Sequence, residues 1–348
     1  MIDLRSDTVT QPTAAMQAAM AAAELGDDVF GGDPSVQRLE QASAEILGKE
    51  AAIFMPSGTM TNQIGLRIHC KPGDEFICEA GCHIYNMEQG AYAQLSGLAA
   101  RPISGRSGVL ELEQLQPLIR PDNIHQVRTK LVSLENTHNR GGGKIYPYET
   151  VAEICDWAHK NGINTHLDGA RLFNAVVATG IDAAEWSRHF DTVSICFSKG
   201  LGAPIGSALA GPAAAIAEAR RHRKAFGGGM RQAGVIASAA HYALENHIAR
   251  LAEDHAHAQI LVRAIEQCEG LSLLDGEVDT NLVFFSVDPS LGTAADFSAA
   301  LKNNGVLINT NSSTTLRAVT HLDVSQTDVE QVAQFLTQLA GKAVSMKT

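Results

Sequence analysis

The sequence predicts an α/β protein: a mostly parallel central sheet with helices on both faces, followed by a smaller α+β domain at the C-terminal end. Two observations support this. Up to about residue 210, short apolar runs alternate with amphipathic stretches, and Gly or Pro separates them. After a long helical region, strand-like and helix-like segments follow one another more closely. A chain of 348 residues is also long enough for two domains.

The N-terminal part is expected to begin with an extended arm over residues 1–15. A helix is predicted over residues 13–23, where Ala and Met dominate, and Ser35 is predicted to cap a second helix that ends near Leu47. A further helix is expected over residues 149–161. Apolar runs predict the strands of the sheet at residues 51–55, 75–78, 130–134, 164–167, 192–197 and 207–210.

A long helical region is expected from residue 232 to residue 268, and we place a domain boundary inside it. This gives a large domain over residues 16–250 and a small domain over residues 251–348. In the small domain the pattern predicts strands at 280–287, 306–309 and 317–320 and helices at 294–303 and 327–339.

Composition and charge exclude several classes of function. The net charge of −11 disfavours nucleic acid as a partner, because an acidic surface repels phosphates. The chain has no apolar run of ~18 residues and no signal-peptide pattern at its start, so we expect no membrane contact. The spacings of its six cysteines match no zinc motif. We therefore expect a cytoplasmic protein with reduced thiols and no metal ion.

A possible phosphate site follows the first predicted strand. Ser57, Gly58 and Thr59 form a turn that opens a helix, where backbone N–H groups, hydroxyls and the helix dipole favour an anion. The alternative is that Ser57 is only a helix N-cap.

Two charged residues follow two other predicted strands. Asp168 could pair with a pyridine N–H group or, alternatively, form a structural ion pair with an arginine. Lys199 could form a Schiff base with an aldehyde, the alternative being a lysine on the surface. Ligands of open α/β sheets bind at the carboxyl ends of the strands, so all three features should share one edge. Together they match the phosphate, ring nitrogen and aldehyde of pyridoxal 5′-phosphate (PLP).

Longer motifs give a resemblance to L-threonine aldolases that extends from residue 2 to about residue 325. They are Asp3-Leu4-Arg5-Ser6-Asp7-Thr8-Val9-Thr10, Leu134-Glu135-Asn136-Thr137-His138-Asn139, Asp168-Gly169-Ala170-Arg171, Ser198-Lys199-Gly200-Leu201-Gly202, Gly227-Gly228-Gly229-Met230-Arg231-Gln232 and Leu316-Arg317-Ala318-Val319-Thr320-His321. The resemblance implies the PLP fold type I of aspartate aminotransferase. It also implies a homotetramer with active sites at dimer interfaces, and cleavage of threonine and allo-threonine to glycine and acetaldehyde.

The resemblance also implies a role for each matching residue. Lys199 binds the cofactor aldehyde, Asp168 its pyridine nitrogen, and Ser57, Gly58 and Thr59 its phosphate, while His83 stacks on the ring. Ser6, Arg171 and Arg317 bind the substrate carboxylate, with Arg171 also next to the cofactor. His125 lies near the substrate hydroxyl, and Arg231 reaches the phosphate of a neighbouring subunit.

Some alternatives stay open from the residues alone. His83 and His125 both qualify as the base that takes the hydroxyl proton, directly or through a water, since imidazole titrates near neutral pH. His83 could instead only stack. The same scaffold could also support β-elimination or racemisation, and a PLP-binding sensor is a non-catalytic alternative.

Overall fold

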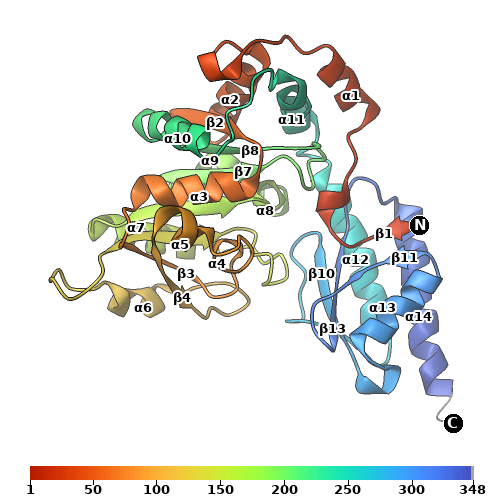
Figure 1. Ribbon diagram of the computed structural model, residues 1–348. Coiled ribbons are helices and arrows are strands. Elements are labelled where there is room, and N and C mark those ends of the chain that lie inside the picture. Colours follow the sequence, from red (N-terminus) through yellow and green to blue (C-terminus); the bar gives the residue numbers. More distant parts are fainter. Residues whose placement is uncertain (346–348) are drawn as a thin grey trace.

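The computed structural model describes residues 1–345 and is built around a seven-stranded sheet (Figure 1). The prediction of a mostly parallel sheet is confirmed, because only β8 runs antiparallel to its neighbours. The strand order is β2 (Ala51–Met55), β8 (Ser207–Gly211), β7 (Thr192–Cys196), β6 (Asn164–Gly169), β5 (Thr129–Glu135), β3 (Glu75–Glu79) and β4 (Ala99–Ile103).

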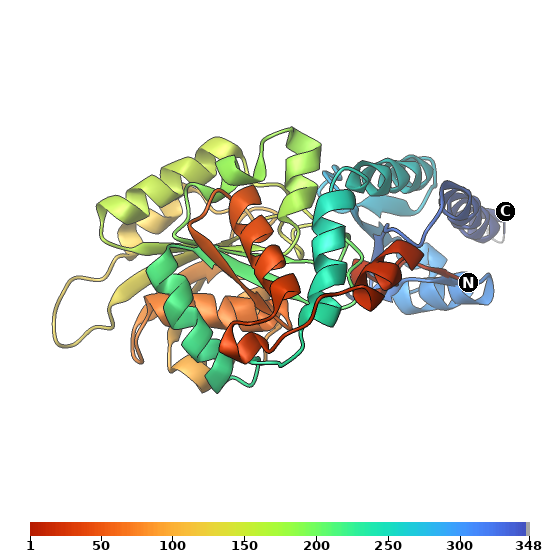
Figure 2. The same ribbon diagram turned by 90° about the horizontal axis from the view of Figure 1, so that it is seen from above.

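Helices cover both faces of this sheet, as predicted. Seen from above, α7 (Tyr148–Lys160) and α8 (Leu172–Thr179) lie on one side, and α3 (Gly58–His69) and α10 (Ala213–Ala225) lie on the other (Figure 2). Every residue of β3, β7 and β8 is buried, as expected for strands packed on both faces. The short helices α4 (His83–Asn86), α5 (Ala91–Ser96), α6 (Leu112–Leu115) and α9 (Ala183–Ser187) fill the remaining connections.

The N-terminal helices are α1 (Ala14–Ala21) and α2 (Pro34–Ile46). The predicted cap of α2 was wrong: Asp33 is the N-cap, and its carboxylate accepts hydrogen bonds from the N–H groups of Ser35 and Val36. Pro34 occupies the first helical position, where its missing N–H group costs nothing.

The predicted long helix is two helices, α11 (Gly234–Asn246) and α12 (Leu251–Glu266). At the break, the Asn246 amide donates to the carbonyl oxygen of Tyr242, and the ring Nδ1 of His247 donates to the carbonyl oxygen of Leu201.

The C-terminal part has its own sheet, in the order β12 (Asn309–Thr310), β13 (Thr315–Val319), β10 (Leu282–Val287) and β9 (Leu271–Leu273). It packs with α12, α13 (Ala294–Asn303) and α14 (Gln326–Ser345) around a hydrophobic core distinct from that of the large sheet. The N-terminal arm reaches this part, because β1 (Ile2–Asp3) pairs with β11 (Val306–Leu307) (Figure 1). None of the described helices combines the length and apolar character needed to cross a bilayer.

Candidate active site

A cavity of about 260 Å³ lies at the carboxyl ends of β2, β6 and β7. It brings together six of the residues predicted from the sequence, which come from segments far apart in the chain. Its lining consists of Pro56, Ser57, Gly58, Thr59, Asn62, His83, Asp168, Ala170, Cys196, Ser198, Lys199, Pro204 and Ile205.

The turn between β2 and α3 forms one end of this cavity. Ser57 is the N-cap of α3, and its Oγ accepts a hydrogen bond from the Met60 N–H group at 3.2 Å. A side chain at Gly58 would meet Cys196, because a Cβ there would lie 2.7 Å from the Cys196 Sγ. The N-cap interpretation of Ser57 is correct, and it is compatible with an anion site, since Gly58 and Thr59, the first two residues of the twelve-residue helix α3, line the cavity.

Asp168 is 2 % exposed and is the next-to-last residue of β6, beside this turn. Its Oδ2 accepts from the Nδ2 of Asn62 at 2.8 Å, and its Oδ1 accepts from the Ala170 N–H group at 3.1 Å. The alternative of a structural pair with Arg171 is wrong, because Arg171 pairs with Asp7 instead. Among the described residues Asp168 has no ion-pair partner, so a buried carboxylate is left facing the cavity without a cation.

Lys199 lies two residues after Phe197, in the turn that follows β7. It is half-buried and lines the cavity, which excludes the surface-lysine alternative. The hydroxyl of Thr10 shares its one hydrogen between the Lys199 and Asp7 carbonyl oxygens, which lie 3.2 and 3.0 Å away. The N-terminal arm therefore holds the backbone from which the lysine projects.

His83 begins α4 and is held at two points. Its backbone N–H group donates to the Oε2 of Glu135 at 2.6 Å, and its Nδ1 donates to the Oε1 of Glu88 at 2.8 Å. Burial lowers the pKa of His83, but the hydrogen bond to Glu88 and the charge of Asp168 outweigh it and leave the pKa raised. Its side chain, 31 % exposed, faces the cavity with the other ring nitrogen available.

The three residues predicted to bind a carboxylate lie beside the cavity rather than in its lining. The Nη1 atoms of Arg171 and Arg317 contact the same acceptor, the Oδ1 of Asn139, at 3.4 and 3.3 Å. Arg317 also donates to the carbonyl oxygen of Arg5, the neighbour of Ser6.

The two arginines differ in their partners. Arg171 is 7 % exposed and forms a bidentate pair with Asp7, with distances of 2.7 and 2.8 Å. Arg317 has no carboxylate partner among the described residues, and burial followed by the charge of Arg171 lowers its pKa. An arginine in this position is suited to bind an incoming carboxylate.

Two predicted residues lie outside the cavity of their own chain. His125 belongs to the loop before β5, where the neighbouring Ile124 is 96 % exposed. Arg231 donates to the Oδ2 of Asp27 at 2.9 Å, and its guanidinium lies 5.8 Å from the ring centre of the exposed Phe30.

Four polar residues of the site were missed by the site prediction. Asp7 stands next to Ser6 in the N-terminal motif, and this adjacency could have drawn attention to it. Asn139 likewise ends the motif that begins at Leu134, whereas the roles of Asn62 and Glu88 depend on contacts with other segments.

One acidic cluster in the site has donor atoms suited to a metal ion. Atoms of His83, Glu88 and Asp168 lie within 4.8 Å of one another. Glu88 already accepts hydrogen bonds from His83, Asn62 and Gln63, and Asp168 accepts one from Asn62. These hydrogen bonds account for the cluster without requiring a metal ion.

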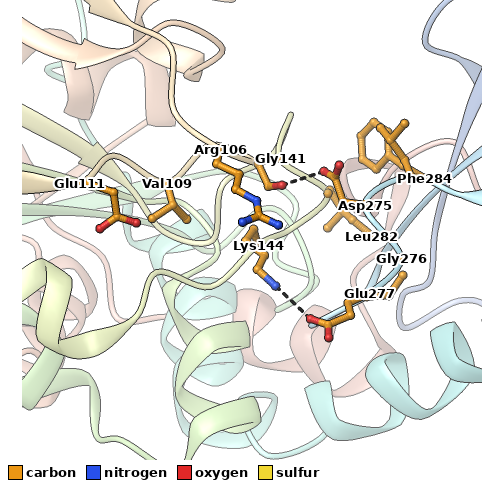
Figure 3. Close-up of a pocket in the computed structure, with 14 residues that line it drawn as sticks. Arg106, Val109, Glu111, Gly141, Lys144, Asp275, Gly276, Glu277, Leu282 and Phe284 are labelled. Atoms are coloured by element: carbon orange, nitrogen blue, oxygen red, sulfur yellow. Dashed lines mark hydrogen bonds and ion pairs between the residues drawn. The ribbon is translucent and has the colours of Figure 1, made fainter. Parts of the chain in front are cut away.

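A larger cavity, of about 700 Å³, lies on another part of the molecule (Figure 3). Three segments line it: residues 106–111, residues 141–144 and residues 274–284. Two of its charged side chains are paired, Lys144 lying 3.5 Å from Glu277, and the Ser107 hydroxyl donates to Asp275 at 2.9 Å. Its other two charged side chains, Arg106 and Glu111, are exposed to solvent. None of the described residues that line it was predicted as a site residue, so its volume alone does not indicate a function.

Comparison with known proteins agrees with this geometry. A model of the beta-eliminating lyase family matches residues 3–289. The chain belongs to this family. It is 46 % identical over 334 residues to a low-specificity L-threonine aldolase of Escherichia coli (strain K12), covering 96 % of this chain and 97 % of the relative. It is 42 % identical to a probable low-specificity L-threonine aldolase 2 of Arabidopsis thaliana over 337 residues, covering 95 % of each chain. The predicted resemblance is confirmed.

Solved structures of the family's fold agree as well. A threonine aldolase of Leishmania major superposes with a TM-score of 0.85 at 21 % identity, covering 98 % of this chain and all of that chain. A serine palmitoyltransferase of Sphingomonas wittichii superposes with a TM-score of 0.78 at 18 % identity, covering 99 % of this chain and 88 % of that chain. At these identities the likeness shows the fold, and the predicted fold type I is confirmed.

Proposed function

We propose that this protein cleaves L-threonine, L-allo-threonine and related β-hydroxy-α-amino acids to glycine and the matching aldehyde, with PLP as its cofactor. One observation carries the proposal. A helix N-terminus, an unpaired buried carboxylate and a lysine share one cavity at the carboxyl edge of the sheet. The curated relatives named as low-specificity L-threonine aldolases support the choice of reaction.

The described residues fit this cofactor. Ser57, Gly58 and Thr59 would hold its phosphate, Asp168 its protonated ring nitrogen and Lys199 its aldehyde carbon, while His83 would cover the ring. Asp168 lacks a cation in the protein itself, and a pyridinium N–H group supplies one. When bound, the cofactor accepts the electrons of the breaking Cα–Cβ bond.

The arginines orient the substrate. Arg317 offers a guanidinium with no carboxylate partner, and Arg171 offers its Nη1 atom beside it. With its carboxylate held there, the substrate cannot rotate freely about its Cα–N bond. Ser6 adds a hydroxyl from the arm. The chain thereby selects which bond at Cα is broken.

The hydroxyl proton of the substrate needs a base. The Nδ1 of His83 is occupied by Glu88, so its Nε2 is the atom left to take this proton, directly or through a water. His125 is the alternative, and it would have to come from a second copy of the chain, because its own loop lies outside the cavity.

We also propose a homotetramer with active sites at dimer interfaces. It is supported by the exposed positions of His125 and Arg231, which lie outside the cavity of their own subunit. Light scattering tests the assembly: about four times the chain mass of 37.0 kDa supports the tetramer, and a monomer contradicts it. Full activity of an isolated monomer would contradict a shared site.

The predicted division into an arm (1–15), a large domain (16–250) and a small domain (251–348) remains our proposal. The break between α11 and α12 and the two separate cores support it. A cytoplasmic location is likewise proposed, in keeping with six free, buried cysteines.

The central experiment is Lys199→Ala. This variant should lose both aldehyde release from L-threonine and the visible absorbance of the lysine-bound cofactor, because no other group can replace the amine. Lys160→Ala, at an exposed position of α7, is the matched control and should keep both. Full activity of Lys199→Ala would overturn the proposal.

β-Elimination is the second candidate, and the description of the matching family model favours it. From L-threonine, retro-aldol cleavage gives glycine and acetaldehyde, whereas β-elimination of water gives 2-oxobutyrate and ammonia. Assaying acetaldehyde and 2-oxobutyrate from this one substrate therefore separates the two reactions, and 2-oxobutyrate as the main product would replace the aldolase assignment.

A further inference from the structure

Asn62, on α3, stands between the two buried carboxylates of the site. It is 2 % exposed, and its Nδ2 donates to the Oδ2 of Asp168 at 2.8 Å and to the Oε1 of Glu88 at 2.9 Å. An amide nitrogen has two hydrogens, and these two bonds use both. The amide oxygen of Asn62 must therefore point away from the carboxylates.

That oxygen meets a buried histidine. The Nε2 of His166 lies 3.3 Å from the Oδ1 of Asn62, and because an amide oxygen can only accept, this nitrogen carries the proton. The Nδ1 of a neutral His166 then accepts, and it does so from the Thr192 hydroxyl at 2.9 Å.

The chain of hydrogen bonds continues to the end of α3. With its hydrogen directed to His166, the Thr192 hydroxyl accepts from the Nε2 of His69 at 2.9 Å. Every link thus donates in one direction, from His69 toward Asp168. His166 must be neutral for its Nδ1 to accept, and burial lowers its pKa to about 3. Burial also lowers the pKa of His69, to about 4.

We propose that Asn62 is a positioning residue for Asp168 and Glu88, and that the chain His69–Thr192–His166 fixes the orientation of its amide. A rotated amide would turn its oxygen toward two carboxylates, which is repulsive at hydrogen-bond distance. The hydrogen bonds from His69 through Thr192 and His166 exclude the rotated amide. Asp168 is therefore held in place for the cofactor nitrogen, and Glu88 is held in place for His83. This inference rests on the proposed function, because it assigns Asp168 to the pyridine nitrogen.

Thr192→Val tests the proposal far from the cavity. Valine has nearly the same shape but no hydroxyl, so His166 loses the donor that sets its tautomer. We expect PLP to bind the apoprotein about three- to tenfold more weakly, the equivalent of one ordinary hydrogen bond, with a changed absorbance spectrum of the bound cofactor.

Thr165→Val is the matched control. Thr165 is also fully buried and also contacts a histidine, but its hydroxyl serves His159 and Asp191 on a separate network. The Thr165→Val protein should lose about as much free energy of unfolding as the Thr192→Val protein, while keeping the wild-type affinity for PLP and the wild-type absorbance spectrum. A Thr192→Val protein that matches Thr165→Val in both readouts would overturn the proposal.

Asn62→Asp is the second variant, for use if Thr192→Val does not fold. It removes both donated hydrogen bonds, and we expect more than tenfold weaker cofactor binding. Unchanged binding would again overturn the inference. Failure of the proposed cofactor assignment is distinguishable, since the wild-type protein would then bind no PLP at all. A change of reaction to β-elimination would alter the products but leave the binding of PLP by the wild-type protein intact.

Discussion

The cavity at the carboxyl edge of the large sheet has less than half the volume of the cavity beside residues 274–284, about 260 against about 700 Å³. In the smaller one, Asp168 and Lys199 face the cavity without ion-pair partners among the described residues. In the larger one, Lys144 is paired with Glu277 and Asp279. Arg106 and Glu111 there form no ion pair with a described side chain, and both are exposed to solvent. Charged groups held partly buried and unpaired need a ligand, whereas paired ones are already satisfied. The burial of unpaired charges, rather than cavity volume, therefore identifies the site.

The largest effect on stability is expected from breaking the buried ion pair between Asp7 and Arg171 beside the site. Asp7→Asn leaves the buried Arg171 without its anion and should lower the free energy of unfolding by about 3–5 kcal/mol. Urea denaturation at neutral pH measures this. A loss below ~1 kcal/mol would mean that the pair is not what holds the arm against the large domain.

The same pair should make stability depend on pH. Burial raises the pKa of Asp7, but Arg171 outweighs it and leaves the folded-state pKa below its ordinary value. The stabilisation is therefore complete above the unfolded value of ~3.9 and is lost as pH falls below it. The stability difference between wild type and Asp7→Asn should narrow in that acidic range.

A smaller effect is expected for the unpaired arginine. Arg317→Met keeps the long apolar stem and removes the charge, so the KM for L-threonine should rise about 10- to 100-fold, as expected for one charged hydrogen-bonded contact. Arg128→Met, which removes an exposed surface arginine paired with Asp74, is the control and should leave KM unchanged. An unaltered KM in Arg317→Met would place the carboxylate elsewhere.

The smallest effect belongs to the larger cavity. Lys144→Met breaks partly exposed pairs with Glu277 and Asp279 and should cost less than ~1 kcal/mol of stability, with activity unchanged within about twofold. A large loss of activity would show that this cavity takes part in the reaction after all.

The sequence alone predicted most strands of the large sheet and the functional side chains that follow them. Apolar runs marked six of the seven strands of the large sheet, and β4 was missed because it is an edge strand containing Arg101 and Pro102. The positions of Ser57, Asp168 and Lys199 followed from the strands, since parallel strands bring their carboxyl ends to one edge.

Tertiary structure alone decided which polar groups meet. Asn62 reaches Asp168 across 106 residues of sequence, Arg171 reaches Asp7 across 164, and Arg317 reaches Asn139 across 178. No local pattern marks such contacts, because they arise from how α3, the arm and the C-terminal sheet pack on the large sheet. The periodicity of apolar residues and the residue types of turns depend on neighbours in the sequence. The pairing of a buried charge depends on the assembled fold.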